Sequence, residues 1–473
     1  MNTENKMRPF GLRDKIGYLF GDLGNDFTFI FSSSFLLKFY TDVMGVSAAA
    51  VGVIMMIARF VDAFTDVTMG RICDRSPTLR AGKFKPWIRR MCAPVAFSSF
   101  LIYQSTLSDM STPFKIGYLF VTYLLWGSVF YTSINIPYGS MASTVSRNAD
   151  DRQSLSTFRS IGATLAGLVI GVGVPIIAYE RGEGGQTLLN GTRFTAVAGV
   201  LSVLAVVCYL LCYHLTTERV RADSTASARE KISVAKMLTG AVKNRALTSI
   251  IAASVTMLLA QLTLQSMANY IFPNYYGNTD AQAVSTVLMT ASVLVAAAFA
   301  KPISRRFGKA EMSAVSAFVA AAVSLLLFFY RPQSVWVYVG LTTVSWLGLG
   351  FFTIVSWALI TDVIDYSELK NGVREDGTIY ALYSFARKMG QAAAAGLSGF
   401  LLTLVGYSET TAFDRSVLNG VYTISTLLPA VGFGFLAVIL KFWYPLSKKT
   451  LENMGRENGE NGERGRRGNG SLF

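Results

Sequence analysis

The chain has 473 residues, of which 52% are hydrophobic and only 15% are charged, whereas soluble domains carry about 25% charged residues. Together with a mean hydropathy of +0.41, this composition excludes an ordinary soluble domain and indicates an integral membrane protein. The net charge of +14 would suggest nucleic-acid binding in a soluble chain, but in a membrane protein the position of the basic residues has to be considered first.

Apolar segments long enough to cross a bilayer, which takes about 20 residues, recur along the whole chain. We identify twelve: 17–40, 46–72, 87–107, 114–141, 156–179, 194–215, 246–272, 282–300, 311–330, 335–361, 378–405 and 417–445. We therefore predict an all-α polytopic membrane protein with 12 transmembrane helices in two six-helix bundles. Its predicted parts are a cytoplasmic N-terminal segment (1–16), the first bundle (17–215), a cytoplasmic central loop (216–245), the second bundle (246–447) and a disordered cytoplasmic tail (448–473).

The basic residues predict the orientation of these spans. Lys and Arg are concentrated in the connection after the second span and in the central loop, whereas the alternate loops contain few of them. The positive-inside rule then places these loops and both termini in the cytoplasm. The net charge therefore reflects topology, and we expect a monomer in the inner (cytoplasmic) membrane that is surrounded by membrane lipid and binds no nucleic acid.

The first span contains the polar stretch GDLGNDFTF, in which Asp22, Asn25 and Asp26 share one helix face. Polar groups at this depth usually face a cavity, and we predict Asp26 as an acceptor for the hydroxyl groups of a sugar. In the alternative interpretation, Asp22 and Asp26 only pair with nearby Lys or Arg. Small residues on the same helix allow close approach of a neighbouring helix: Gly17, Gly21 and Gly24.

The second span contains ARFVDAFTDVTMG, in which Arg59, Asp62 and Asp66 are three and four residues apart and therefore form one stripe. Each charge in a membrane helix costs roughly 2.5 to 3.5 kcal/mol. Two close carboxylates repel each other unless a cation lies between them or one is protonated. We predict a site for H+ or Na+, with Asp62 and Asp66 as the metal ligands if the ion is Na+. The alternative is a structural ion pair of Arg59 with one carboxylate, which leaves the other unexplained.

The fourth span, WGSVFYTSINIPYGSM, repeats polar and aromatic residues at helical spacing: Ser128, Tyr131, Asn135 and Tyr138, with Thr132 beside them. Aromatic faces combined with amides suit a pyranose ring, which stacks on its CH face and hydrogen-bonds at its edge. The same stripe is also compatible with helix packing alone.

Charged residues at the cytoplasmic ends of the spans are candidates for gating. The tenth span ends in TDVIDYSELK, which places Asp362 and Asp365 opposite the basic loops and close to Arg374. Asp74 and Arg75, at the end of the second span, belong to the same predicted group. Exposed charge pairs contribute little individually, so this assignment depends on several pairs acting together.

The eleventh span, TIYALYSFARKMGQAAAAG, carries a polar face: Tyr380, Ser384, Lys388 and Gln391. A lone buried ammonium loses its proton or seeks a carboxylate, so we predict that Lys388 contacts the carboxylates of the first bundle. The alternative is a lysine that extends to the membrane surface. Arg387 points to another face, and the pattern assigns it no role.

The motifs GYLFGDLGNDF, FLLKFYTDVMGVSAAAVG, ARFVDAFTDVTMG, RAGKFKPW, NIPYGSM, TDVIDYSELKNGVRE, FARKMGQA and FWYPL resemble those of the glycoside-pentoside-hexuronide:cation symporters of the major facilitator superfamily. The resemblance runs from about 15 to 447. Within the family the chain looks most similar to bacterial glucuronide carriers and more distantly to the melibiose carrier. It implies the major facilitator fold, with a cation bound by Asp62 and Asp66 near Thr132. It also implies a sugar site at Asn25, Asp26, Tyr131, Asn135, Arg159 and Lys388.

The chain departs from the melibiose carrier at Asn25, Asn135 and Gly139, where that protein has Lys, Asp and Trp. Loss of a carboxylate eases entry of an anionic sugar, which Arg159 or Lys388 can pair, although a neutral pentoside also fits. We therefore predict a symporter that imports a glycoside, such as a glucuronide or a related pentoside or hexoside, by alternating access. No enzymatic activity and no cofactor other than the coupling ion are expected. The alternative is a lipid or lysolipid translocator of the same fold, against which the polar lining argues.

Overall fold

The computed structural model describes residues 8–79, 81–182, 184–220, 244–371 and 376–453. Most of the predicted central loop and tail lies outside these residues, so the disorder predicted for the tail stays a prediction. The chain is divided into two compact units. Unit 1 is formed by described residues of Met1–Arg229, Gln265–Val287 and Ala392–Tyr422, and unit 2 by those of Glu230–Leu264, Leu288–Gln391 and Thr423–Phe473.

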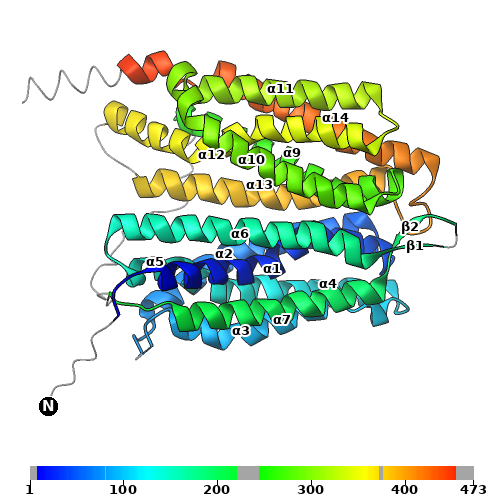
Figure 1. The fold of residues 1–473 in the computed structure, drawn as a ribbon, viewed down its shortest axis with the longest axis horizontal. Helices are drawn as coiled ribbons and strands as arrows, with labels where there is room; N and C mark the ends of the chain where they lie inside the picture. The colour runs from blue at the N-terminus through cyan, green and yellow to red at the C-terminus, as the bar shows by residue number, and fades with distance from the viewer. Residues whose placement is uncertain (1–7, 80, 183, 221–243, 372–375, 454–473) are drawn as a thin grey trace, which may run out of the picture. The chain divides into compact units, whose positions relative to one another are not determined.

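The first part of the chain, which belongs to unit 1, is helical apart from one short hairpin (Figure 1). Its elements are α1 (Leu12–Asp42), α2 (Ala48–Arg75), α3 (Lys85–Ile102), the 3-10 turn η1 (Ser105–Leu107), α4 (Thr112–Leu124), the π-helix η2 (Leu125–Tyr131), α5 (Thr132–Val145), α6 (Ala149–Ala178), β1 (Tyr179–Arg181), β2 (Thr187–Leu189) and α7 (Gly191–Leu215). The two strands are antiparallel, with Tyr179 opposite Leu189.

The second part of the chain contributes to both units. Its elements are α9 (Arg245–Tyr270), the π-helix η3 (Ile271–Tyr275), α10 (Thr279–Phe307), α11 (Lys309–Tyr330), α12 (Val335–Asn371), α13 (Asp376–Leu404), α14 (Arg415–Val438) and the π-helix η4 (Ile439–Trp443). Helices α11 and α12 lie in unit 2 only, whereas α9, α10, α13 and α14 have one end in each unit.

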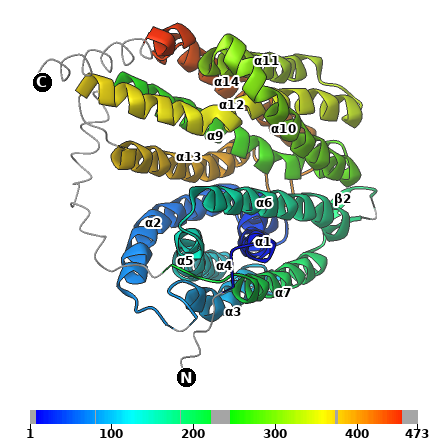
Figure 2. The ribbon, with the colours of Figure 1, turned by 60° about the vertical axis from the view of Figure 1, so that its left-hand side comes forward.

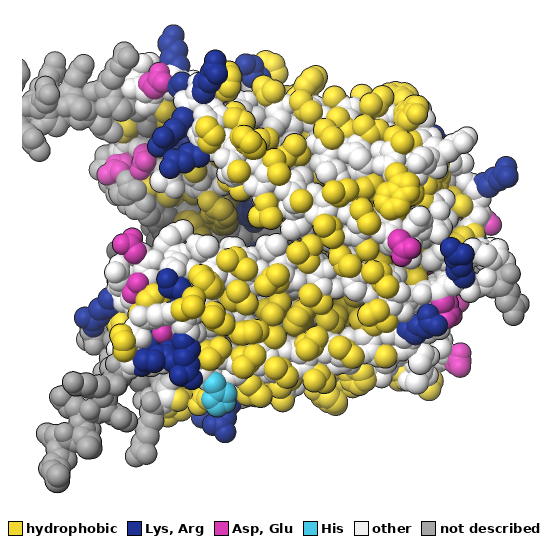
Figure 3. Space-filling view, viewed as in Figure 1, with side chains coloured by type: hydrophobic (Ala, Val, Ile, Leu, Met, Phe, Trp, Pro, Cys, Tyr) yellow, Lys and Arg dark blue, Asp and Glu magenta, His cyan; other side chains and the backbone are white. Residues whose placement is uncertain are grey.

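Apart from one or two residues at their ends, eleven of the twelve predicted spans fall on a helix or on an unbroken run of helical elements, which confirms the all-α membrane fold. The span 87–107 is interrupted between α3 and η1. By length and hydropathy, nine helices or helical runs in the described part of the chain qualify as membrane spans. The three predicted spans that do not qualify are those of α1, α3 and α13. Charged residues lower the hydropathy of α1 and α13, and α3 is short and begins with a basic stretch. On the face drawn in Figure 3, hydrophobic side chains cover the middle of the helices and charged ones lie towards the ends.

Helix α1 occupies the middle of unit 1, where it packs most extensively against α6 and α7 (Figure 2). A Cβ atom at Gly17 would lie 2.7 Å from the Cβ atom of Leu215, and one at Gly21 would overlap the ring of Tyr138. These contacts confirm that the glycines of the first span allow neighbouring helices to approach closely. Polar residues on α1 are therefore surrounded by protein on several sides.

Helices α2 and α13 meet backbone to backbone within unit 1. A Cβ atom at Gly52 would lie 3.1 Å from the Cα atom of Gly399, and one at Gly399 would overlap the carbonyl group of Ala48. The backbone N–H of Ala49 donates to Thr403 Oγ1 over 2.9 Å. This contact was not predicted from the sequence, since the two glycines are separated by more than 300 residues.

We expect Gly399→Ala to lower the thermal unfolding temperature of the purified protein by several degrees. The added methyl group would meet backbone atoms, which cannot rotate away, and overpacking typically costs about 1–3 kcal/mol. The matched control is Gly173→Ala on α6, where an added Cβ atom meets no heavy atom within 4 Å. That variant is expected to be as stable as the parent or slightly more stable, because alanine favours a helix over glycine. Equal unfolding temperatures for the two variants would contradict the assigned contact.

In unit 2, helices α11 and α12 pack through small residues. A Cβ atom at Gly348 would lie 2.5 Å from the carbonyl oxygen of Ser316. Close to this contact, the hydroxyl groups of Ser324 and Ser345 lie 3.0 Å apart and both residues are buried. This pair satisfies polar atoms between the two helices and holds α12 firmly against its neighbour.

Candidate functional site

Two carboxylates of α2 face two hydroxyl groups of the run formed by η2 and α5. Ser128 Oγ donates to Asp62 Oδ1 over 2.6 Å, and Thr132 Oγ1 donates to Asp66 Oδ1 over 3.0 Å. The two carboxylates are four positions apart in sequence and so are the two hydroxyl residues, so the two helices meet in register along one stripe. The structure thus brings Asp62, Asp66 and Thr132 together and adds Ser128 to them. Their role as cation ligands stays a prediction.

The π-helical geometry of η2 places further oxygen atoms beside these carboxylates. Thr132 Oγ1 lies 3.2 Å from the carbonyl oxygen of Gly127, and a Cβ atom at Gly127 would lie 3.4 Å from Asp62 Oδ1. Single turns of π-helix are frequent at functional sites. In the part of the chain that the structure describes, no group of three or more His, Cys, Asp or Glu residues could hold a metal ion. Two carboxylates with hydroxyl and carbonyl oxygens suit a hard monovalent ion or a proton.

Arg59 lies beside the acidic pair. Its Nη1 atom is 3.6 Å from Asp62 Oδ2, and its Nη2 atom donates to Ser33 Oγ over 3.2 Å. The guanidinium also lies over the ring of Phe29, with Cζ 4.5 Å from the centroid. The structure therefore contains the ion pair considered as the alternative interpretation, formed with Asp62. Asp66 accepts a hydrogen bond from Thr132.

The predicted sugar-binding amides of α1 and α5 contact each other. Asn25 Nδ2 lies 3.4 Å from Asn135 Oδ1, and the hydroxyl of Tyr209 on α7 donates to Asn25 Oδ1 over 2.9 Å. Asn25 is buried, whereas Asn135 is partly exposed. Tyr209 thus fixes Asn25, which in turn orients Asn135. No feature of the residue pattern predicted that Tyr209 belongs to this group.

Tyr131 of η2 lies close enough to Asp26 of α1 to interact with its charge, and neither side chain has a hydrogen-bond partner among the described residues. Tyr131 stacks on Phe29 at a centroid distance of 5.4 Å and packs against Trp126 at 5.5 Å. Within the described residues, the partly buried carboxylate of Asp26 has no hydrogen bond or ion pair. An acceptor without a partner next to an aromatic ring is the combination that sugar sites use. Asp26 thus forms no ion pair with Lys or Arg among the described residues, although the charge of Arg159 acts on it.

Asp22 and Arg159 form a close ion pair between α1 and α6. Arg159 Nε donates to Asp22 Oδ1 over 2.9 Å, and the guanidinium lies 5.4 Å from the ring centroid of Tyr138. A side chain exposure of 41% leaves part of Arg159 accessible, whereas Asp22 is buried. Asp22 thus pairs with a basic residue, as the alternative interpretation of the first span proposed. Arg159 keeps donors that Asp22 does not use.

The predicted site residues of unit 2 lie on α12 and α13. Asp362 pairs with Lys309 at the start of α11 over 2.6 Å, and Asp365 is exposed. Asp74 and Arg75, in unit 1, are also exposed. Arg374 lies outside the described residues. Lys388 is partly buried on α13. Its predicted contact with carboxylates of unit 1 stays a prediction.

A second buried charge network, which the sequence analysis did not identify, lies in unit 1 around Lys38 of α1. Lys38 is 1% exposed, and its Nζ atom lies 2.6 Å from Asp42 Oδ2. Nζ also donates to Asn274 Oδ1 of η3 over 2.8 Å and to the hydroxyl of Tyr407 over 2.9 Å. The rings of Tyr270 and Tyr407 cover the ammonium at 4.5 and 5.4 Å. Three segments far apart in sequence are thus joined through one cation.

Tyr407, which follows the end of α13, completes this network. Its hydroxyl donates to Asp42 and lies 3.0 Å from each carboxylate oxygen. Burial, followed by the negative charge of Asp42, raises the pKa of the Tyr407 phenol well above its usual value. The phenol therefore keeps its proton and remains a donor. The one sequence signal for this network was the spacing of four between Lys38 and Asp42.

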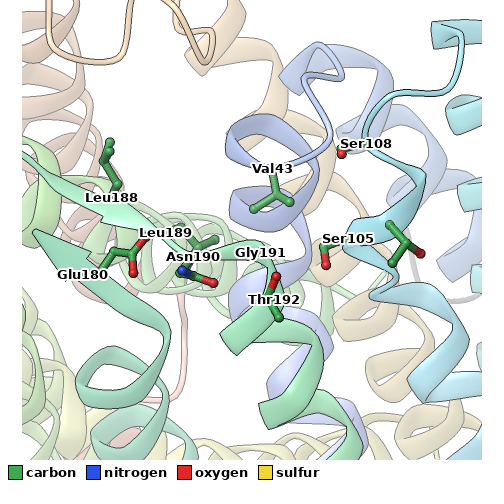
Figure 4. A pocket seen from close by; sticks show the side chains of 10 residues that line it. Val43, Ser105, Ser108, Glu180, Leu188, Leu189, Asn190, Gly191 and Thr192 are labelled. Atoms are coloured by element: carbon green, nitrogen blue, oxygen red, sulfur yellow. The ribbon is translucent and has the colours of Figure 1, made fainter. Parts of the chain in front are cut away.

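A pocket with a volume of about 430 Å³ opens elsewhere in unit 1, at the ends of α1 and α7 (Figure 4). Its polar lining includes Ser105, Glu180 and Asn190, and Glu180 also pairs with Arg193 over 3.5 Å. None of the predicted cation-binding or sugar-binding residues lines it. The pocket is therefore separate from the polar groups of α1, α2 and α5.

A family model described as MFS/sugar transport protein matches residues 17–448. A glucuronide carrier protein homologue of Escherichia coli (strain K12) is 31% identical and covers 93% of this chain and 94% of its own length. An isoprimeverose transporter of Lactiplantibacillus pentosus is 30% identical, with coverages of 91% and 88%. An uncharacterised symporter of Bacillus subtilis (strain 168) is 28% identical over 94% of both chains.

Solved structures with the same fold include a D-xylose–proton symporter, with a TM-score of 0.60 and 14% identity over 92% of this chain and 98% of that one. A bacterial homologue of the human lysosomal transporter Spinster has a TM-score of 0.63 and 10% identity, with coverages of 91% and 95%. At these identities the likeness concerns the fold alone.

Proposed function

Because this chain belongs to the MFS/sugar transport family over residues 17–448, we propose that it imports a glycoside together with one cation, H+ or Na+, by alternating access. Members of this family are transporters, so the chain is a multi-pass membrane transporter and not an enzyme. Its place in the inner membrane, with both termini in the cytoplasm, and its action as a monomer are parts of the proposal.

The observation that carries the proposal is the matched pairing of Asp62 with Ser128 and of Asp66 with Thr132. Two carboxylates on adjacent turns inside a membrane protein are costly unless a positive charge accompanies them. Arg59 supplies one such charge, next to Asp62. A transported cation would bind at these carboxylates, with the hydroxyl and carbonyl oxygens as further ligands.

The proposed sugar site is formed on the unit 1 side by Asn25, Asp26, Tyr131, Asn135 and Arg159. Asp26 would accept hydrogen bonds from sugar hydroxyls, and Tyr131 would stack on the ring. Asn25 and Asn135, held by Tyr209, present neutral amides to the sugar edge. Arg159, with donors beyond those that Asp22 uses, would donate hydrogen bonds to sugar hydroxyls. The similarity to a glucuronide carrier homologue and to an isoprimeverose transporter supports a glycoside as the substrate.

Coupling requires that cation and sugar favour the same state. Because such coupling is reciprocal, the cation must tighten sugar binding as much as the sugar tightens cation binding. We propose that Lys388 responds to the charge of the acidic pair. The charged helix ends at Asp74, Arg75, Asp362, Asp365 and Arg374 would close the cytoplasmic side. Asp362, bound to Lys309, provides one pair of this kind.

The test is counterflow uptake in proteoliposomes loaded with unlabelled sugar, using a panel of phenyl glucuronides, xylosides and galactosides. Each assay is repeated at fixed pH with and without sodium, and then with a proton gradient alone. We expect saturable exchange of at least one glycoside class and stimulation by one of the two cations. Uptake that no cation affects, or inhibition by lysolipid in the absence of inhibition by any sugar, would reject glycoside symport.

A further inference from the structure

An arginine in unit 2 lies within a group of aromatic side chains from α12 and α13. The Cζ atom of Arg387 is 5.5 Å from the ring centroid of Trp357 and 5.7 Å from that of Tyr383. Trp357 stacks on Tyr380 with 5.1 Å between centroids and meets Tyr383 edge to face at 5.2 Å. The Tyr383 hydroxyl lies 2.7 Å from Ser254 Oγ on α9, which fixes that ring.

The guanidinium of Arg387 has no acceptor. Among the described residues it makes no hydrogen bond and no ion pair, and its Nη1 atom is buried without a partner. An arginine in a protein remains charged, so the group combines a fixed positive charge with unused donors. Aromatic faces attract the cation, but they do not accept its hydrogen bonds as an oxygen atom does. A negatively charged oxygen ligand would supply what this group lacks.

The side of α12 and α13 that carries this group has the composition of a water-accessible surface. On α12, Trp357, Thr361 and Asp365 follow one another at intervals of four, and all three are exposed. On α13, Tyr380, Ser384, Arg387 and Gln391 recur at helical spacing. The expectation that Arg387 points away from this polar face was therefore wrong, because positions 380, 384, 387 and 391 share one side of a helix.

A different side of α13 exposes Phe385, Phe400 and Leu404, which is the composition expected against lipid. Charged and amide groups inside a membrane protein face water or protein. Trp357 and Tyr380 are 41% and 52% exposed, so two stacked rings beside the partly buried Arg387 are open on a polar side.

We propose that Arg387 binds the carboxylate of an acidic sugar and that Trp357 and Tyr380 pack against its ring. The planar guanidinium matches a carboxylate with two parallel hydrogen bonds, and Trp357 and Tyr383 hold it in place. An uncharged glycoside would leave the positive charge without a counter-ion. This inference rests on the proposed function for the assumption that a glycoside is the ligand, and it assigns the transported class to uronides.

The binding test uses the purified full-length chain in lipid nanodiscs and titration calorimetry with phenyl β-D-glucuronide and phenyl β-D-glucoside. These probes differ at one sugar carbon, so the ratio of their affinities measures carboxylate recognition. We expect the parent to prefer the glucuronide by roughly 10- to 100-fold. Arg387→Met should bring the ratio close to 1. Arg387→Lys should give an intermediate ratio, because lysine keeps the positive charge but lacks the two parallel N–H donors of the guanidinium.

The control is Arg331→Met, a change at an exposed arginine at the end of α11, which should keep the parent ratio. A parent without preference for the glucuronide, or an Arg387→Met variant with the parent ratio, would overturn the proposal. Equal weakening of both ligands would also overturn it, since that result indicates a structural role. If Arg387→Met does not give a monodisperse protein, Arg387→Lys decides the question.

Uptake assays separate this proposal from the proposed function. Cation-stimulated glycoside uptake by the parent, combined with an affinity ratio that Arg387→Met does not change, would reject the uronide site and leave symport intact. A ratio that depends on Arg387, combined with no uptake under any cation gradient, would reject symport and leave the binding site intact.

Discussion

Replacing Asp62 with asparagine is expected to abolish gradient-driven accumulation of the glycoside. The amide is nearly the same size as the carboxylate and can still accept a hydrogen bond from Ser128, which lies 2.6 Å from Asp62 Oδ1. The change therefore removes the charge and largely preserves the packing. Without this charge the site has one carboxylate and the nearby Arg59, so it no longer attracts a cation. The measurement is the ratio of internal to external labelled sugar at steady state in energised vesicles.

The same variant should also lose the effect of the cation on sugar affinity. Coupling free energies of about 1–3 kcal/mol correspond to changes in affinity of roughly 5- to 150-fold. We expect a cation-dependent dissociation constant of this order in the parent and the same constant with and without the cation in Asp62→Asn. The control is Asp150→Asn in the first turn of α6, distant in sequence from the acidic pair. Undiminished accumulation by Asp62→Asn would contradict the assignment of the cation site.

Local periodicity explains why part of this site was predictable. The stripe formed by Arg59, Asp62 and Asp66 depends only on positions within one helix, so a spacing of three and four residues was sufficient to identify it. The same holds for Ser128 and Thr132, which recur every four residues on the next polar helix. The alignment of the carboxylates with the hydroxyl groups depends on how α2 packs against η2 and on the π-helical geometry of η2. The residue pattern indicated neither the packing nor the π-helix.

Contacts between distant segments account for what the sequence did not reveal. Tyr209 belongs to a nearly uniform apolar helix, so the hydrogen bond to Asn25 has no signal in the pattern. The contact of Gly52 with Gly399 joins helices more than 300 residues apart. The sequence pattern set Arg387 apart from the polar face of α13, although it shares that face with Tyr380 and Gln391. The aromatic group around it becomes apparent only once α12 lies beside α13.

Lys38 is a further example, and its replacement should have a large effect on stability. Lys38→Met removes the cation from a buried carboxylate, since Lys38 is 1% exposed and Asp42 is 14% exposed. Breaking a buried pair by removing one partner costs about 3–5 kcal/mol, because the remaining charge is left without compensation. Asp42 would keep hydrogen bonds from Thr41 and Tyr407, but neither group carries a positive charge. We expect a clear decrease in the thermal unfolding temperature of the purified protein.

An exposed pair with the same spacing in sequence provides the control for this experiment. Lys448 and Glu452 are also four residues apart on a helical segment, at 3.8 Å and with side chains 39% and 56% exposed. Exposed pairs contribute about 0–1 kcal/mol, so Lys448→Met should change the unfolding temperature little. Similar small changes in both variants would show that burial does not strengthen the Lys38 pair.

The double variant Lys38→Met/Asp42→Asn separates the loss of the charge pair from the loss of the surrounding contacts. With both charges removed, no uncompensated ion stays buried, so the double variant should be more stable than Lys38→Met alone. Interacting residues typically show coupling energies of 0.5–3 kcal/mol, and a buried ion pair belongs at the upper end of this range. The loss of stability that remains in the double variant, relative to the parent, would come from the missing hydrogen bonds of Lys38 to Asn274 and Tyr407. Those bonds connect α1 to η3 and to the segment after α13, so this remainder measures how strongly Lys38 holds these three segments together.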